Sequence, residues 1–397
     1  MRLLYLNHNV VGTGTYQRAS SLAHELAARG HAVTLVTTSG GRRLSACERQ
    51  ADGVRIIEAP DLLAGPARNG WDGWNAGWRV RRLARERFDL IHAFDCRPAV
   101  ILPALAQRQR DGAALFLDWA DWWGRGGTIQ ERSGWAVRTF FGPIETWFEE
   151  HFRTAATANT TISEPLRQRC IALGVPADQV LALPNGCAAP AQRPVDRDAA
   201  RRHLGVGREP LIAHAGVAQR ADATLLFDSF RLLQRDVRDA RLVLIGNFRA
   251  GVPADLRDAV TRAGFVDTTT LHAWLAAADI GVIPLRDTVA ARARWPGKIN
   301  DYLTAGLPAV LPRVGAAAAY IERGGAGVTC AAEATSLAAA MATALRDDAA
   351  RAAMSRAARA LAAGELAWPR IADALDTFYG RHASGAAAQH RFTVSAT

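Results

Sequence analysis

The sequence lacks several features that would fix its class at once. No apolar run approaches the roughly 20 residues that a membrane-spanning helix needs, and Arg2 is followed by only a short apolar stretch instead of a signal peptide. We therefore expect a cytoplasmic protein. The odd number of cysteines, widely scattered and without metal-like spacing, excludes a disulfide framework and predicts no metal site. They are Cys47, Cys96, Cys170, Cys187 and Cys330.

Lysine is almost absent. The 397 residues include 48 Lys plus Arg, and Lys298 is the only lysine among them. One lysine in an arginine-rich chain suggests a place that needs a compact point charge instead of a planar fork. The alternative is that Lys298 has been retained by chance at a solvent-exposed helix end.

The formal net charge is +10. The arginines are spread along the chain and no nucleic-acid recognition module appears, so we expect no nucleic-acid partner. Attraction to anionic substrates explains the charge equally well. A loose peripheral contact with an anionic surface such as the inner membrane is a further option.

Residues 295–308 form the most informative stretch. Pro296 suits the first turn of a helix, and Gly306 followed by Pro308 suits its end. Lys298 lies in the first turn, and Asp301, three residues on, shares its face. A cation at a helix N-terminus, one turn from a carboxylate, could hold phosphates and ribose hydroxyls together.

Two βαβ units of Rossmann type are expected. In the first, an apolar strand over residues 2–8 leads through Gly12 and Gly14 into a helix. As a dinucleotide fingerprint these glycines are incomplete, because the third glycine is missing. In the second, a strand over residues 211–215 ends at Gly216, and a helix and another strand follow.

These motifs resemble the retaining GT-B glycosyltransferases of family 4. The matching residues are Pro296, Lys298, Tyr302, Leu303, Gly306 and Pro308, with Asp301 in place of the usual Glu, and the Ser-Glu and Pro-Asn-Gly passages within 160–186. The resemblance implies an α/β GT-B fold, two Rossmann-like doubly wound domains that face an interdomain cleft. It also implies transfer of a glycosyl group from a nucleotide-diphosphate sugar, with retention of configuration and without a metal or other cofactor.

The resemblance also implies a domain layout. Residues 1–187 would bind the acceptor and 188–366 the nucleotide-sugar donor. Residues 367–382 would form a closing helix that packs back on the N-terminal domain, and 383–397 a disordered tail.

For the donor, the resemblance assigns the diphosphate to Lys298 and the ribose to Asp301, with Gly216, Arg294, Pro296 and Gly297 beside them. Two family residues are missing. Val217 stands where the family has an Arg, with Arg220 as an approximate substitute for a nearby Lys, and Ala293 stands where a Glu holds the donor sugar. UDP or GDP is the favoured nucleotide.

For the acceptor side, the resemblance places Gly12, Gly14 and His92 at the cleft. Asp118 and Asp121 follow a predicted strand at 113–117, with aromatic neighbours that include Trp122. Either carboxylate could accept hydrogen bonds from sugar hydroxyls or act as a base. Solvated acids that cap a loop are the alternative.

A tryptophan-rich segment leaves two interpretations open. Trp71, Trp74 and Trp78 recur at helical spacing and are followed by Arg79, Arg81 and Arg82. They form either a platform for the acceptor or the membrane, or a helix face packed on the core.

The identity of the acceptor, a small molecule, a glycan or a lipid-linked molecule, stays open. A degenerate, non-catalytic GT-B binding protein and a GT-B sugar-nucleotide epimerase are the alternative functions.

Overall fold

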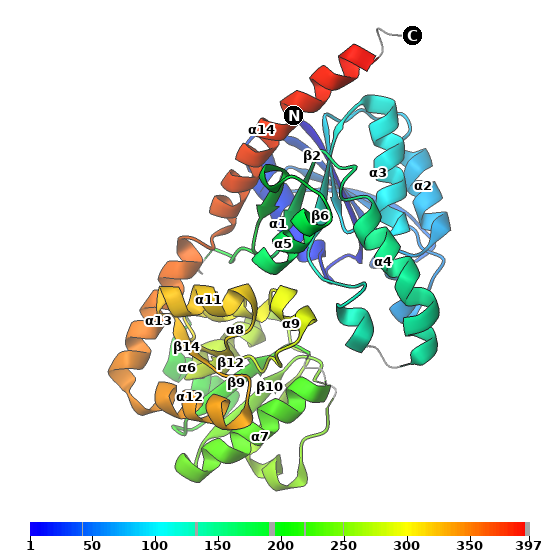
Figure 1. Cartoon of the computed structure of the whole chain (residues 1–397). Helices are drawn as coiled ribbons and strands as arrows, with labels where there is room; N and C mark the ends of the chain where they lie inside the picture. The colour runs from blue at the N-terminus through cyan, green and yellow to red at the C-terminus, as the bar shows by residue number, and fades with distance from the viewer. Residues whose placement is uncertain (42, 132–133, 190–194, 218–219, 249, 394–397) are drawn as a thin grey trace. The chain divides into compact units, whose positions relative to one another are not determined.

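The computed structural model describes residues 1–41, 43–131, 134–189, 195–217, 220–248 and 250–393. The chain forms two compact units (Figure 1). Unit 1 comprises Met1–Pro184 and Trp368–Thr397, and unit 2 comprises Asn185–Ala367. The sequence analysis put this boundary three residues later, between residues 187 and 188.

Unit 1 is built on an eight-stranded sheet with the order β3-β4-β2-β1-β5-β6-β7-β8. All neighbours pair in parallel except β3, an antiparallel edge strand on β4. The strands are β1 (Arg2–Val10), β2 (Ala32–Thr38), β3 (Cys47–Ala51), β4 (Val54–Ala59), β5 (Leu90–Phe94), β6 (Ala114–Trp119), β7 (Ala158–Thr161) and β8 (Val180–Ala182).

Helices cover both faces of this sheet because successive side chains of each buried strand point to opposite sides. Leu3 and Tyr5 of β1 join a core cluster with the first and last helices, whereas Leu4 and Leu6 join a second cluster on the other face. The helices of unit 1 are α1 (Tyr16–Ala28), η1 (Gly65–Ala67), α2 (Gly73–Leu83), α3 (Pro98–Asp111), η2 (Thr128–Glu131), η3 (Val137–Phe141), α4 (Gly142–His151), α5 (Glu164–Ala172), η4 (Ala177–Gln179) and α14 (Trp368–Thr393).

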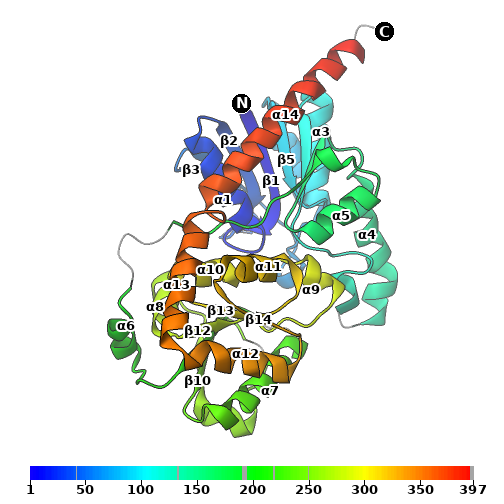
Figure 2. The ribbon, with the colours of Figure 1, turned by 60° about the vertical axis from the view of Figure 1, so that its left-hand side comes forward.

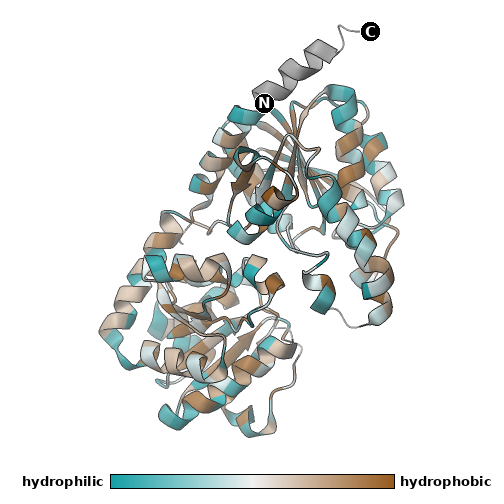
Figure 3. Ribbon diagram, in the orientation of Figure 1, coloured by the Kyte–Doolittle hydropathy of each residue, from teal (hydrophilic) through white to brown (hydrophobic). Residues whose placement is uncertain are grey.

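Unit 2 has a six-stranded, fully parallel sheet with the order β11-β10-β9-β12-β13-β14. In both units the strands are coloured mostly as hydrophobic (Figure 3). The strands of unit 2 are β9 (Leu211–Ala215), β10 (Arg241–Ile245), β11 (Val260–Gly264), β12 (Ile280–Val282), β13 (Ala309–Pro312) and β14 (Gly327–Cys330). Its helices are α6 (Arg197–Leu204), α7 (Arg220–Asp236), η5 (Ala254–Ala259), α8 (Thr268–Ala277), α9 (Val289–Ala293), α10 (Lys298–Ala305), α11 (Gly315–Gly324), α12 (Ala334–Arg346) and α13 (Asp348–Ala363).

Two helices differ from what the sequence favours. The sequence of 135–158 favours one long helix, but in the structure a π-helical turn, η3, precedes α4, which ends at His151, and 158–161 form strand β7. The closing helix was expected to stop at 382, whereas α14 continues to Thr393 through an alanine-rich segment with high helix propensity.

The long last helix returns to unit 1. Ile371, Leu375, Phe378 and Tyr379 of α14 are buried in the core cluster that also contains α1 residues, and Figure 2 shows α14 beside α1. Among the described residues, no helix is long and apolar enough to cross a membrane.

Candidate functional site

Helix α10 in unit 2 is the short helix that residues 295–308 predict. It begins at Lys298 and ends at Ala305. Gly306 has φ of 70°, the left-handed conformation that closes a helix, and its N–H donates to the Leu303 carbonyl. Pro308 follows, so the helix cannot restart.

The side chains of Lys298 and Asp301 meet at the start of this helix. Lys298 Nζ lies 3.1 Å from Asp301 Oδ2, and both side chains are partly exposed, at 42% and 34%. The lysine stem runs across Gly216, because a Cβ at Gly216 would lie 3.3 Å from Lys298 Cγ. The lysine, the carboxylate and the glycine are therefore neighbours.

This cluster lies at the topological switch point of the sheet. Strand β9 pairs with β10 on one side and with β12 on the other, and Gly216 directly follows β9. Gly246, after β10, has φ of 103°, and a Cβ there would lie 3.3 Å from the Gly216 nitrogen. In open parallel sheets ligands bind outside the carboxyl ends of the strands at this point.

Buried side chains hold α10 in place. Tyr302 is fully buried, and its hydroxyl accepts a hydrogen bond of 2.9 Å from the Ala215 N–H at the end of β9. Trp295 Nε1 donates to Asn300 Oδ1 at 2.6 Å, and Asn300 Nδ2 donates to the Asn185 carbonyl at 2.9 Å. The partly exposed amine of Lys298 is therefore carried by a helix that buried hydrogen bonds hold in place.

The other predicted donor residues surround this helix with differing exposure. Pro296 and Arg294 are half-buried and Gly297 is exposed. Ala293 is fully buried and Val217 is 65% exposed. Because both side chains are hydrocarbon, neither supplies a polar group to the site. The side chain of Arg220 lies outside the described residues.

Asp118 does not occupy the position that the sequence analysis gave it. It belongs to β6 instead of a following loop, and it is fully buried. Arg18 of α1 binds both carboxylate oxygens, and Thr160 Oγ1 donates to Oδ1 at 2.6 Å. Burial alone would raise the pKa of Asp118, but the Arg18 guanidinium outweighs it and the pKa is lowered. Asp118 is thus a structural anchor and not a base that faces a substrate.

His92 was expected to face a cleft, and the structure contradicts this. It lies in the middle of β5 and is fully buried. Its Nδ1 bonds the Tyr379 hydroxyl, and its Nε2 lies 3.0 Å from Thr160 Oγ1. Because Thr160 donates its proton to Asp118, it accepts from His92 Nε2–H. Burial lowers the pKa of His92 to about 3, so the ring is neutral.

The remaining predicted residues of unit 1 lie in loops after β1 and β6. Gly12 and Gly14 are exposed with φ of 80° and 54°, and the Gly14 turn is braced by Asn9, whose Oδ1 accepts from the Thr15 N–H at 3.0 Å. Asp121 and Trp122 are half-buried. These four residues, unlike Asp118 and His92, remain accessible at the ends of parallel strands.

The sequence analysis missed a polar cluster at the end of β5. Asp95 directly follows the strand and has φ of 79°, a strained value for a residue with a side chain. Its Oδ2 lies 4.0 Å from His8 Nδ1 and 3.4 Å from Arg97 Nε. Burial, followed by the charge of Arg97, lowers the pKa of His8 to about 3. Strained residues cluster at functional sites, which makes Asp95 a candidate. In the sequence, the available signal was an acidic residue directly after a buried strand.

The tryptophan-rich segment does not form one platform. Trp71 precedes α2, and its ring contacts Phe141 and Phe148, whereas Trp78 packs against the core. Only Trp74 is exposed, at 41%. Arg79 is fully buried and donates to the Asn7 carbonyl, so it cannot meet a phosphate at the surface.

Two α/β units built on parallel sheets are the GT-B fold, which this chain shares with solved glycosyltransferases. Residues 13–186 match the model of the glycosyl transferase 4-like domain, and residues 209–347 match that of glycosyl transferases group 1. The chain belongs to this glycosyltransferase family.

Solved structures share the fold over nearly the whole chain. The sucrose-phosphate synthase of Thermosynechococcus elongatus is 16% identical with a TM-score of 0.70, covering 96% of this chain and 99% of that one. WaaG, a glycosyltransferase involved in lipopolysaccharide biosynthesis, is 18% identical with a TM-score of 0.68, covering 95% and 100%. Anabaena HepE in complex with UDP is 16% identical with a TM-score of 0.68, covering 96% and 100%. No curated protein matches the sequence.

Proposed function

We propose that this glycosyltransferase holds a nucleoside-diphosphate sugar in unit 2 and transfers its sugar to an acceptor bound by unit 1. The observation that carries the proposal is the position of Lys298, with Nζ 3.1 Å from Asp301 and its stem over Gly216 at the switch point. In this proposal Lys298 binds the diphosphate and Asp301 accepts hydrogen bonds from the ribose hydroxyls.

The leaving nucleoside diphosphate needs stabilisation as the glycosidic bond breaks. Lys298 and the N–H groups at the start of α10 supply positive charge there. These groups support a reaction in which the protein itself neutralises the diphosphate, without a metal. Retention of configuration is part of the proposal through the resemblance of residues 295–308 to retaining enzymes.

The nucleotide is proposed to be UDP or GDP. HepE was solved with UDP and with UDP-glucose, and a starch synthase IV from Arabidopsis thaliana with ADP. These neighbours support a nucleoside diphosphate as the donor class. The acceptor would lie at the loops that carry Gly12, Gly14, Asp121 and Trp122, with the nature of the acceptor left to experiment.

Thermal unfolding in the presence of a panel of nucleotide-sugars tests the donor, because a ligand that binds the native state raises its stability. The best donor then enters a hydrolysis assay, with and without a chelator, and the anomeric form of the released sugar is read by NMR. Turnover that persists with the chelator and retains configuration supports the proposal. Release of the opposite anomer overturns retention.

A degenerate binding protein is the second candidate. Two observations favour it: Val217 and Ala293 bring no polar side-chain atom to positions where the family has charged residues. A donor that raises the unfolding temperature but is never turned over, with or without added acceptors, would support this alternative.

A further inference from the structure

Helix α4 of unit 1 is amphipathic in the reverse of the usual sense. Its polar residues Glu145, Thr146 and Glu149 are buried, whereas Ile144 and Trp147 are each 49% exposed. Surface helices of soluble proteins normally turn their apolar stripe to the core.

The buried polar residues have specific partners that explain the inward side. Glu149 accepts hydrogen bonds from Trp119 Nε1 and from the backbone N–H groups of Trp123 and Gly124, at 2.7 to 2.9 Å. Glu145 accepts from Arg97 Nη2 at 3.2 Å. The orientation of α4 is therefore fixed from inside.

Large apolar side chains are exposed at helical spacing along residues 135–147, which include η3 and the first part of α4. We call this set the α4 face: Trp135, Val137, Phe140, Ile144 and Trp147, with exposed fractions of 67%, 40%, 67%, 49% and 49%. Trp135 and Phe140 contact each other, with ring centroids 6.0 Å apart. Several large apolar side chains exposed along one short segment are typical of an interaction surface.

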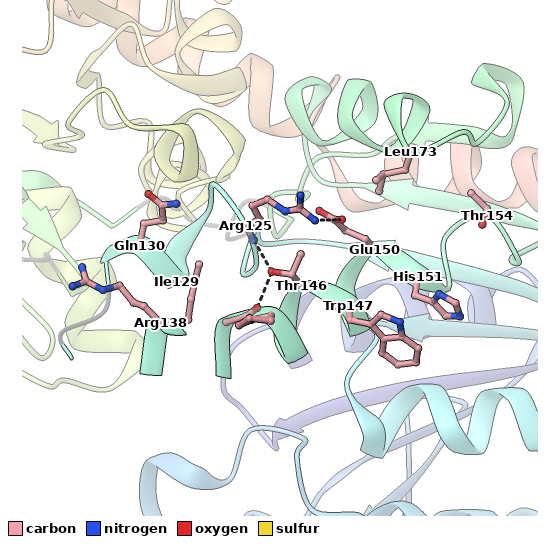
Figure 4. A pocket seen from close by; sticks show the side chains of 12 residues that line it. Arg125, Ile129, Gln130, Arg138, Thr146, Trp147, Glu150, His151, Thr154 and Leu173 are labelled. Carbon is pink, nitrogen blue, oxygen red and sulfur yellow. Dashed lines mark hydrogen bonds and ion pairs between the residues drawn. The ribbon is translucent and has the colours of Figure 1, made fainter. Parts of the chain in front are cut away.

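Most of the exposed charges near the α4 face are basic, although the exposed Glu131 lies four residues before Trp135. Arg138 is exposed between its apolar residues, and Arg125 and His151 are also exposed. The acids of residues 134–151 are Glu145 and Glu149, which are buried, and Glu150, which pairs with Arg169 and Arg125. A cavity of about 970 Å³ beside the face is lined by Arg125, Arg138 and Trp147 (Figure 4).

We propose that the α4 face docks the protein on the surface of an anionic lipid bilayer. The aromatic and aliphatic side chains enter the boundary between headgroups and acyl chains, where tryptophan is favoured. Arg138 meets the lipid phosphates, with the cavity giving room for a headgroup. The positive border favours an anionic lipid over a neutral one, and the inference does not depend on the proposed glycosyl transfer.

Co-sedimentation of the full chain with vesicles tests this docking. The vesicles contain phosphatidylcholine alone or mixed with phosphatidylglycerol, at low and high salt. We expect binding to the mixed vesicles that weakens at high salt. The double variant Trp135→Ser/Phe140→Ser should bind at least about tenfold more weakly, because two largely exposed aromatic rings no longer enter the lipid. Arg138→Glu should weaken binding by about fivefold or more.

The matched control is Trp74→Ser, which removes an exposed tryptophan of the same unit beside exposed Arg81 and should leave binding unchanged. Circular dichroism and thermal unfolding check that the variants fold. If the double variant fails to fold, Arg138→Glu alone decides, since its side chain is exposed.

Three results would overturn the proposal. The first is no binding of the wild-type chain to phosphatidylglycerol vesicles at low salt. The second is binding by the double variant and by Arg138→Glu that is as strong as that of the wild-type chain. The third is a concentration-dependent dimer that the double variant abolishes while vesicle binding is absent, which would make a second copy the occupant of the α4 face.

Discussion

Arg18 and Asp118 form a fully buried ion pair between the first helix and the sixth strand of unit 1. Arg18 Nη2 lies 2.9 Å from Asp118 Oδ1 and Nε lies 3.0 Å from Oδ2, and the two side chains are 2% and 0% exposed. Arg18 Nη1 also donates to the Pro184 carbonyl at the end of the N-terminal part of the unit. The pair thus joins α1, β6 and the last residue before unit 2.

Asp118→Asn should destabilise unit 1 strongly. The change leaves the Arg18 guanidinium buried without its counter-charge, which costs about 3–5 kcal/mol. Urea unfolding measures the free energy. Asp121→Asn, at a half-buried loop position, is the matched control and should change the free energy of unfolding by much less. Equal effects of the two substitutions would contradict the structural role of Asp118.

Lys298→Ala should reduce turnover far more than stability. The Lys298–Asp301 pair is partly exposed, so its loss costs at most about 1 kcal/mol of folding free energy. Removing one charge-assisted contact with a leaving diphosphate lowers kcat about 10²-fold or more. Lys298→Arg should recover part of the rate. Steady-state kinetics and thermal unfolding measure both effects, and full activity of the alanine variant would refute the assignment.

Asp301→Asn should weaken nucleotide binding while α10 stays folded. The carboxylate can accept from both ribose hydroxyls, whereas the amide offers one acceptor oxygen. Calorimetric titration of wild type and variant with UDP and GDP measures the difference. An unchanged affinity would mean that Asp301 serves only as the local partner of Lys298.

The buried histidines should make the protein sensitive to acid. Burial lowers the pKa of His92 to about 3 and of His214, in unit 2, to about 4, against about 6.5 in an unfolded chain. The unfolded state therefore binds more protons than the folded state between these pKa values. The contribution of the neutral histidines to stability is complete above pH about 6.5 and is lost as the pH falls from there towards the folded-state pKa of about 3 to 4. Each histidine contributes a slope of about 1.4 kcal/mol per pH unit there.

His92→Gln provides the test of this slope. Glutamine can still donate to Thr160 and accept from Tyr379 but does not titrate. Urea unfolding of wild type and variant at several pH values between about 3.5 and 6 should show a slope smaller by about 1.4 kcal/mol per pH unit in the variant. Parallel curves would show that His92 is not the titrating group.

The sequence predicted what local chemistry determines. Pro296, Gly306 and Pro308 delimit α10 through backbone rules, and the three-residue spacing alone brings Lys298 beside Asp301. The two parallel sheets also follow from alternating strands, glycine turns and helices.

What the sequence did not predict depends on partners far along the chain. His92 is buried because Tyr379, 287 residues later, returns on α14 to bond its ring. Asp118 is neutralised by Arg18, 100 residues earlier. From its neighbours alone, each resembles a polar residue at the end of a strand, and only the packing of α1 and α14 on the sheet decides otherwise. The reversed polarity of α4 is hidden in the same way, because Glu149 is satisfied by a loop some 25 residues before it.

The partly exposed amine of Lys298 also makes the protein addressable by chemistry. Since no other lysine exists in the sequence, an amine-reactive reagent has one side-chain target, besides the amine at the start of the chain. The extent of acylation at Lys298, read by mass spectrometry, is therefore a direct gauge of how often the proposed donor site is occupied. A bound nucleoside diphosphate would shield the amine, so occupancy could be followed without a mutation, a radiolabel or knowledge of the acceptor.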